Sequence, residues 1–192
     1  MSATPPPRAL RADARRNRDR LLAAAVSAFA RDTDATLDAI AKEAGVGIGT
    51  LYRHFPTRES LVEAAYRNEL GRLCDAAPEL GATLPPDRAV RAWMDRFVDY
   101  LATKRGMATA LRAVIASGGD PYAESRGRLL AAITPLLDAG VAAGTIRSGV
   151  DPLDVLVALN GVSLAAGSPE QREQAGRLLD LLMDGLRARP TG

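Results

Sequence analysis

The segment IAKEAGVGIGTLYRHF, residues 40–55, holds two short helical patterns separated by a glycine. On both sides of Gly45, apolar side chains recur at the three- and four-residue spacing of a buried helical face. Glycine often ends a helix because it adopts the left-handed conformation without strain. The pattern predicts a helix–turn–helix, with one helix over residues 37–44 and the next over about 47–55. An ordinary corner between two bundle helices has the same spacing, so spacing alone leaves both interpretations open.

Two further glycines, Gly47 and Gly49, fall in the first turn of the second predicted helix. A corner needs neither, and glycine weakens a helix by about 1 kcal/mol relative to alanine. A helix inserted into the major groove of DNA does have a use for them, because a missing side chain lets backbone N–H groups approach phosphates or bases closely. The helix is roughly 13 Å long and the groove is about 12 Å wide. The glycines therefore favour DNA binding over a structural corner.

The rest of the chain carries amphipathic helical patterns and no strand pattern. Hydrophobic residues make up 47% of the chain and aromatic residues only 4%, which is typical of a helical core rich in leucine and alanine. We predict an all-α fold of about nine helices. The predicted helices cover residues 13–30, 37–44, 47–55, 58–78, 87–104, 107–116, 121–143, 152–166 and 169–186, with N-caps at Thr36 and Thr57 and a proline kink at Pro135.

The predicted helices fall into two domains behind a short arm. Residues 1–9 are rich in proline, and we expect them to form a disordered arm. The helix–turn–helix lies within residues 10–70, which we expect to form the first domain. Long helices fill residues 80–189, which we expect to form the second.

Positive charge is concentrated at the start of the chain. Residues 1–20 carry six arginines and two aspartates, a net charge of +4, although the whole chain carries only +2. A basic amino-terminal arm on a faintly acidic body favours a polyanionic partner such as DNA. A solvated tail without a partner has the same composition, so the charge pattern alone leaves both interpretations open.

The residue counts argue against several classes of protein. One histidine and one cysteine exclude a disulfide framework and a Cys/His zinc cluster, and we predict no metal and no cofactor. His54 has no acidic orienter or nucleophile at a suggestive spacing, so we predict no enzymatic activity. Cys74 is interpreted as an inert small hydrophobe, with redox sensing as the alternative. No apolar run is long enough to span a membrane and no signal peptide is visible, so we expect a cytoplasmic protein.

The stretch TLDAIAKEAGVGIGTLYRHFPTRESL, residues 36–61, resembles the DNA-binding signature of the TetR/AcrR family of transcriptional regulators. The resemblance covers about residues 15–70. It rests on Thr36, Ile40-Ala41, Ala44-Gly45-Val46, Gly49-Thr50-Leu51-Tyr52, His54-Phe55, Arg58 and Leu61. It implies an amino-terminal three-helix DNA-binding domain, followed by a helical domain that binds an effector and dimerises.

The resemblance also implies roles for individual side chains in the DNA-binding domain. The residues expected to meet phosphates are Thr36, Tyr52, His54 and Arg58. The residues expected to face the bases are Ile48, Gly49, Thr50 and Arg53, with Gly47 beside them at the N-cap position. An arginine at residue 53 can reach a guanine edge bidentately, and Ile48 or Thr50 can touch a thymine methyl. Gly47 departs from the family, which often has a capping serine there, and the loop 31–35 lacks a glycine that is often present.

In the second domain, a hydrophobic stripe and one amide are candidates for the effector pocket. Trp93, Phe97 and Tyr100 belong to the predicted helix over 87–104. The apolar stripe of this helix by itself indicates only core packing. In the family this helix commonly lines the ligand cavity, so these residues are expected to do both. Asn160 lies in the otherwise apolar run VLVALNGVSLA, and an unpaired buried amide costs about 1–3 kcal/mol. We expect it to meet a ligand, a water or its own twin across a dimer.

The last two predicted helices are candidates for a dimer interface. The helix over 152–166 is apolar nearly all round, and the helix that follows has a leucine-rich face over 175–186. Together they predict a four-helix seam with a second copy of the chain, although burial within one subunit explains the same pattern.

These observations predict a homodimeric, ligand-responsive transcriptional regulator, expected to be a repressor of a near-palindromic DNA operator. Its small-molecule effector cannot be named from the sequence. The alternative is a helical binding protein or enzyme whose helix–turn–helix is vestigial. A constitutive architectural DNA-binding protein is a third possibility.

Overall fold

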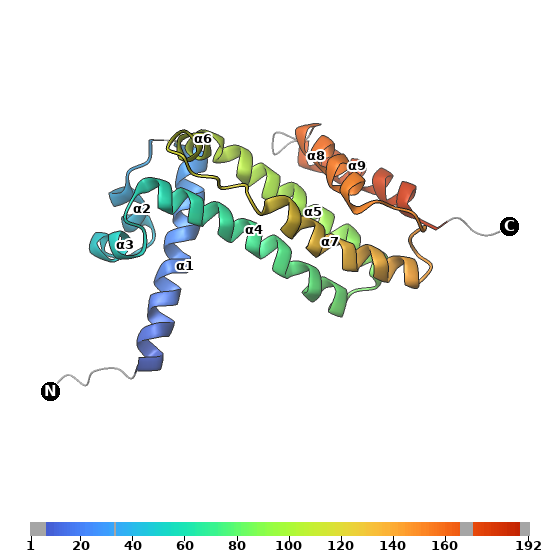
Figure 1. The fold of residues 1–192 in the computed structure, drawn as a ribbon, viewed down its shortest axis with the longest axis horizontal. Coiled ribbons are helices and arrows are strands. Elements are labelled where there is room, and N and C mark those ends of the chain that lie inside the picture. The colour runs from blue at the N-terminus through green and yellow to red at the C-terminus, as the bar shows by residue number, and fades with distance from the viewer. Residues whose placement is uncertain (1–6, 33, 166–170, 189–192) are drawn as a thin grey trace. The chain divides into compact units, whose positions relative to one another are not determined.

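Most of the chain that the structure describes is helical. The computed structural model describes residues 7–32, 34–165 and 171–188. Nine helices and no strand occupy these ranges (Figure 1). They are α1 (Pro7–Arg31), α2 (Leu37–Glu43), α3 (Ile48–His54), α4 (Arg58–Thr83), α5 (Pro86–Gly106), α6 (Ala108–Ala116), α7 (Ser125–Ala142), α8 (Pro152–Ala165) and α9 (Arg172–Leu186). The predicted all-α fold and its helix order are confirmed.

Helix α1 begins earlier than the sequence pattern predicts. It starts at Pro7 instead of near Asp13, so residues 7–9 of the expected disordered arm are helical. Proline is accepted at the first helical position because its missing N–H would have no helical partner there. The expectation of disorder for residues 1–6 lies outside the described residues.

Helix α4 runs past the proline that was expected to end it. Pro78 lies inside the helix, which continues to Thr83. Proline removes one helical hydrogen bond and costs about 3 kcal/mol in a helix interior. Burial of Ala76, Ala77 and Leu80 around it offsets this cost, so the predicted end near Pro78 is wrong.

Two later helices also differ from their predicted starts. Helix α7 begins at Ser125 instead of Pro121, because residues 121–124 form turns. Pro135 lies inside α7, as predicted. Helix α9 begins at Arg172, and the predicted start at Pro169 lies outside the described residues.

The nine helices belong to two compact units. The first contains the residues up to Asn68 together with Thr103–Pro121, and therefore holds the helix–turn–helix and α6. The second contains Glu69–Ala102 and the chain from Tyr122 onward. Helices α4 and α5 each contribute residues to both units. The sequence pattern assigned α6 to the second domain, whereas its residues group with the first unit.

Each unit has its own hydrophobic core. Side chains that are buried in the first unit include Leu21, Leu22, Phe29, Ile40, Leu51, Leu61, Tyr66 and Met107. Those buried in the second include Leu70, Trp93, Met94, Phe97, Ile133, Leu159 and Leu179. The predicted apolar stripe of α5 is therefore core. None of the helices within the described ranges is long and apolar enough to cross a membrane.

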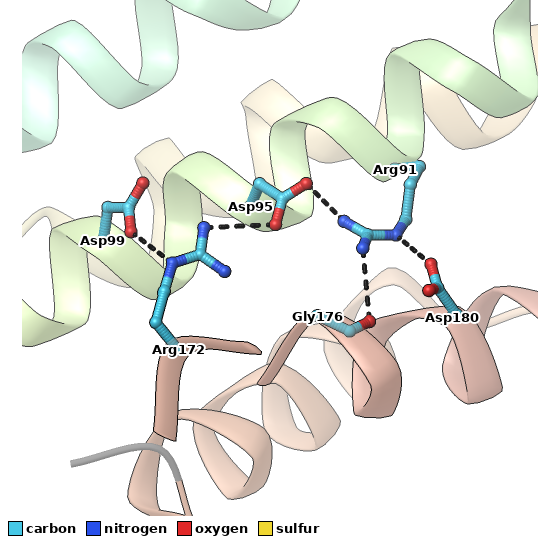
Figure 2. Close-up of polar contacts among 6 residues, drawn as sticks. All are labelled: Arg91, Asp95, Asp99, Arg172, Gly176 and Asp180. Atoms are coloured by element: carbon cyan, nitrogen blue, oxygen red, sulfur yellow. Dashed lines mark hydrogen bonds and ion pairs between the residues drawn. The ribbon is translucent and has the colours of Figure 1, made fainter. Parts of the chain in front are cut away.

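A chain of ion pairs fastens α9 to α5 in the second unit (Figure 2). Arg91 of α5 pairs with Asp95 on its own helix and donates from Nε to Asp180 of α9 at 2.8 Å. Arg172 of α9 donates to Asp99 at 3.0 Å and to Asp95 at 3.1 Å. Partial burial acts to lower the pKa of Arg172, but its hydrogen bonds to Asp99 and Asp95 outweigh this and raise the pKa above its usual value. The two helices are therefore tied by charge-assisted bonds.

Candidate nucleic-acid interface

Local capping fixes where α2 begins. Thr36 has an extended backbone, and its side-chain oxygen accepts a hydrogen bond from the N–H of Ala39 at 3.2 Å. This satisfies one of the N–H groups that have no partner within the helix. The other end of α2 is tied to α1 by an ion pair between Glu43 and Arg31 at 2.6 Å. The N-cap predicted at Thr36 is confirmed.

A glycine turn and two buried side chains then set the direction of α3. Gly45 has φ of +63°, the left-handed conformation that favours glycine. The N–H of Val46 donates to the carbonyl of Ala41 at 3.0 Å and closes the turn. Leu51 and Phe55 are buried in the first unit. The helix–turn–helix predicted from residues 40–55 is therefore present.

The opposite face of α3 is open to solvent and carries the side chains expected to meet DNA. Tyr52 is 50% exposed and Arg53 is also exposed. Ile48, Thr50 and His54 are half-buried. The described residues thus place the aromatic, cationic and hydroxyl groups of α3 on an accessible helix.

Neither of the additional glycines is required by the protein's own structure. Gly47 is the N-cap of α3, with φ of −64°, and Gly49 also lies outside the left-handed region. A Cβ added at either position would meet no atom within 4 Å. Backbone strain and internal packing therefore do not explain the glycine at either position.

Arg58 lies at the start of α4 and turns towards the protein. Its guanidinium lies 4.7 Å from the centroid of the Phe29 ring and donates a hydrogen bond to the carbonyl of Ala35. Ala35 directly precedes the N-cap of α2, so Arg58 joins α1, the start of α2 and α4. The resemblance implied a phosphate contact for Arg58. Its internal contacts have no counterpart in the sequence pattern, because they depend on where α1 lies.

Two arginines of α1 approach the helix–turn–helix. The guanidinium of Arg18 lies 5.7 Å from the centroid of the Phe55 ring. The Nη1 atom of Arg20 lies 3.7 Å from the position that a Cβ on Gly45 would occupy. Both side chains are exposed and belong to the basic segment predicted to favour a polyanion. Their charge adds to the positive potential beside α3.

An exposed short helix at the end of a glycine turn, with arginines beside it, is the arrangement of a DNA-reading helix–turn–helix. The amino-terminal family model, described as bacterial regulatory proteins of the tetR family, matches residues 21–65. The carboxy-terminal model, described as the C-terminal domain of SbtR-like transcriptional regulators, matches residues 85–188. The chain belongs to the TetR family of transcriptional regulators.

Solved structures agree with this assignment. A TetR transcriptional regulator from Streptomyces coelicolor is 59% identical, with 91% of this chain and 99% of that chain covered and a TM-score of 0.86. A TetR regulator from Mycobacterium vanbaalenii is 34% identical, with 93% and 99% covered and a TM-score of 0.77. FadR from Bacillus subtilis, solved with stearoyl-CoA, shares the fold at 18% identity, with 87% and 98% covered and a TM-score of 0.61. No curated protein sequence matches the chain.

The three aromatic residues proposed for the effector pocket lie in the core of the second unit. Trp93 is fully buried, and its indole N–H donates to the carbonyl of Leu73 at 3.1 Å. Its ring lies 5.5 Å from that of Phe97, which lies 6.1 Å from the ring of Tyr100. Phe97 and Tyr100 are also buried. These contacts show that the aromatic stripe is core packing of the second unit, and a second role in lining an effector pocket stays a prediction.

Asn160 differs from its prediction in this TetR subunit. Its side chain is exposed, and its amide donates to the carbonyl of Leu156 at 2.8 Å, one turn earlier in α8. The premise that it is buried and unpaired within the subunit is therefore wrong, because α8 is covered on fewer sides than its composition suggested. A ligand, a water and its own twin across a dimer stay its predicted partners.

A cavity of about 540 Å³ lies between α4 and α7 of the second unit, and none of the four proposed effector residues lines it. Much of its wall is apolar and small, with Ala77, Pro78, Ala132, Pro135, Leu136 and Ala139 among the lining residues. Cys74 and Arg128 also line it. Sequence reasoning missed this wall because alanine, glycine and proline give no strong hydrophobic stripe.

Large apolar side chains are exposed on the last two helices. Val157 and Leu164 of α8 are 62% and 76% exposed, and Leu181 of α9 is 67% exposed. These helices are the ones predicted to form a dimer seam. Exposed leucines of this size on neighbouring helices are typical of a surface that another protein covers.

Proposed function

We propose that this TetR-family regulator is a homodimeric repressor that binds a near-palindromic DNA operator and releases it when a small molecule binds the second unit. The observation that carries the DNA-binding part is the pair of glycines at residues 47 and 49. They sit on an exposed helix where neither backbone conformation nor internal packing calls for glycine.

In the proposed complex, α3 lies in the major groove. Arg53 reads a guanine edge, while Ile48 and Thr50 contact base edges or thymine methyls. Gly47 and Gly49 let the backbone of α3 come close to the DNA. The exposure of Arg53 and the half-burial of Ile48 and Thr50 support this assignment.

Phosphate contacts fix the position of the helix in the groove. We assign them to Thr36, Tyr52 and His54, following the family resemblance, and to the exposed arginines of α1 beside α3. Neutralisation of phosphates releases counterions, so affinity should fall steeply as salt rises. Arg58 is assigned to positioning α2, because its guanidinium contacts the ring of Phe29 and donates to the carbonyl of Ala35.

The dimer is needed because a single α3 covers only one half-site. Two recognition helices related by a two-fold axis meet successive major grooves about 34–36 Å apart. We propose that α8 and α9 form the seam, which the exposed Val157, Leu164 and Leu181 support.

Effector response requires that the ligand binds one conformation of the dimer more tightly than the other. FadR from Bacillus subtilis, which has this fold, was solved with stearoyl-CoA. A cavity in the second unit of this chain supports a ligand site there as well. We propose the cytoplasm as the site of this activity, because the proposed partner is operator DNA.

The test is selection of genomic fragments from the source organism by the purified full chain at increasing salt, followed by sequencing. The proposal predicts enrichment of one near-palindromic site, and an enrichment that is about tenfold or more weaker in the Arg53→Ala variant. Arg112→Ala is the matched control, because Arg112 is exposed on α6 and bonds only to Thr109 on the same helix. Absence of an enriched site at every salt concentration would favour the vestigial helix–turn–helix, and enrichment without sequence preference would favour an architectural protein.

A further inference from the structure

The cavity between α4 and α7 has a polar end and an apolar end. At one end, the Nη2 atom of Arg128 lies 3.6 Å from the position that a Cβ on Gly71 would occupy. At the other, the Cδ2 atom of Leu136 lies 3.2 Å from the equivalent position on Gly81. Ten residues of α4 separate the two glycines, a rise of about 15 Å. The second half of α4 and α7 run alongside each other in this unit (Figure 1).

Arg128 supplies the positive charge at the polar end. Its side chain is half-buried and takes part in no ion pair among the described residues. A partly desolvated guanidinium is a strong bidentate partner for a carboxylate, because its planar fork matches the two oxygens. Because no carboxylate of the described residues forms an ion pair with Arg128, that fork is open to a carboxylate ligand.

Two other polar groups lie near Arg128. The thiol of Cys74 lies 3.6 Å from the carbonyl oxygen of Arg128, to which it donates. Asp75 also lines the cavity, but its side chain is exposed at the rim. Of the two charged groups, Arg128 is thus the more shielded from water. Electrostatic interactions are stronger in such a shielded place than in water. Asp75 opposes an anion at this site only through a solvent-screened interaction.

The wall beyond Arg128 has no further charged side chain. It consists of small apolar residues on both helices, among them Ala77, Ala131 and Ala132, and continues along α7 past Leu136 to Ala139. A volume of about 540 Å³ lies within the range of small-molecule sites. A ligand that fills it needs an apolar body and one anionic group at the end.

We infer that this cavity binds an apolar monocarboxylic acid, with the carboxylate on the guanidinium of Arg128 and the hydrocarbon body along the alanine wall towards Leu136. The inference names the effector class of the proposed regulator and in that respect rests on the proposed function. The binding itself involves the second unit alone and can be measured without DNA.

The experiment measures thermal stabilisation and calorimetric binding of the full chain with a panel of alkyl and aryl monocarboxylates that includes decanoate and phenylbutyrate. Decanol and decyltrimethylammonium serve as neutral and cationic probes with the same body as decanoate. At least one acid should stabilise the protein in a saturable manner, and its neutral and cationic analogues should bind at least about tenfold more weakly.

Four single-residue variants test whether the acid binds in the cavity beside Arg128. Arg128→Gln should lower the affinity for the acid at least about tenfold. Asp75→Asn should raise that affinity roughly twofold to fivefold. Arg126→Gln is the matched control, since Arg126 is an exposed residue of α7 outside the cavity lining, and it should leave the affinity unchanged. Ala131→Leu narrows the cavity at an exposed helical position. It should lower the affinity for the acid although the charge of Arg128 is unchanged. Circular dichroism without ligand shows that each variant is folded.

Three results would overturn the inference: no acid of the panel binds, the alcohol binds as tightly as the acid, or Arg128→Gln binds the acid like the original chain. The selected DNA site is titrated in parallel with the same preparation. Operator binding without acid binding would contradict the inferred ligand class but not the proposed regulatory function. Acid binding without any operator binding would contradict the proposed function but not the inferred acid-binding site.

Discussion

The guanidinium of Arg58 stacks on the ring of Phe29, 4.7 Å from its centroid, and also donates to the carbonyl of Ala35. A cation over an aromatic face and a charge-assisted hydrogen bond are each worth a measurable amount when partly shielded from water. The carbonyl belongs to the residue before the N-cap of α2. Arg58 therefore holds the start of the first helix of the helix–turn–helix against α1.

Replacement of Arg58 by methionine should lower the free energy of unfolding by about 2 kcal/mol, because both contacts are lost. Urea denaturation followed by circular dichroism measures this, with Arg112→Met as the control that removes an exposed arginine of α6. The dependence of operator affinity on salt should keep its slope. A slope that falls by about 0.9 with unchanged stability would instead show the phosphate contact that the family resemblance implies.

Gly49→Ala should change stability and DNA binding in opposite directions. Alanine favours a helix by about 1 kcal/mol over glycine, and the added methyl meets no protein atom within 4 Å, so the thermal midpoint should rise. The same methyl should weaken operator binding, because it stands between the backbone of α3 and the DNA.

The control for that experiment is Gly127→Ala in α7, where an added Cβ also meets no atom within 4 Å. It should raise the thermal midpoint of unfolding and leave the affinity for the operator unchanged. If Gly49→Ala stabilises the protein and binds the operator as tightly as before, the glycine has no role in close approach.

Leu164→Glu and Leu181→Glu should each convert the dimer into a monomer. Both leucines are more than half exposed in the single subunit, and a carboxylate at a buried seam is costly to desolvate. Operator affinity should fall more than about tenfold, since the two half-site contacts no longer act together. Sedimentation velocity measures the mass, and Ile115→Glu, on α6, is the control at an exposed apolar residue of another surface. A dimer that survives both substitutions would place the seam elsewhere.

The thiol of Cys74 should be slow to react with alkylating reagents. Burial raises its pKa above that of a free thiol, although the nearby charge of Arg128 acts in the opposite direction. At pH 8 the reactive thiolate is therefore scarcer than in a free cysteine, and the rate should keep rising with pH beyond the usual range. The rate of iodoacetamide labelling, compared with the same chain in urea, measures this. Faster labelling of the folded chain would support a reactive, redox-sensing cysteine.

The sequence predicts the helix–turn–helix well because its determinants are local. Thr36 caps α2 and Gly45 ends it through interactions within a few residues, and the burial of Leu51 follows from helical spacing. Predictions that depended on distant contacts were less accurate. The continuation of α4 past Pro78 depends on burial around it, which outweighs the local cost of proline.

The site was predicted less completely than the fold for the same reason. The contact of Arg58 with Phe29 joins residues far apart in the sequence, and periodicity gives no sign of it. Asn160 was expected to be buried because its neighbours in the sequence are apolar, yet α8 leaves it exposed within the subunit. The cavity beside Arg128 is lined by small residues whose pattern resembles ordinary helix packing.

The most direct test of DNA reading by α3 is the ratio of affinities for the selected operator and a scrambled site of the same length, measured at one fixed salt concentration. The original chain should prefer the operator by at least about a thousandfold. Arg53→Ala should reduce that ratio about tenfold or more and leave the affinity for the scrambled site nearly unchanged, because a base contact carries specificity. Equal affinity of the original chain for both sites, or an unchanged ratio in the variant, would contradict sequence reading by α3 through Arg53.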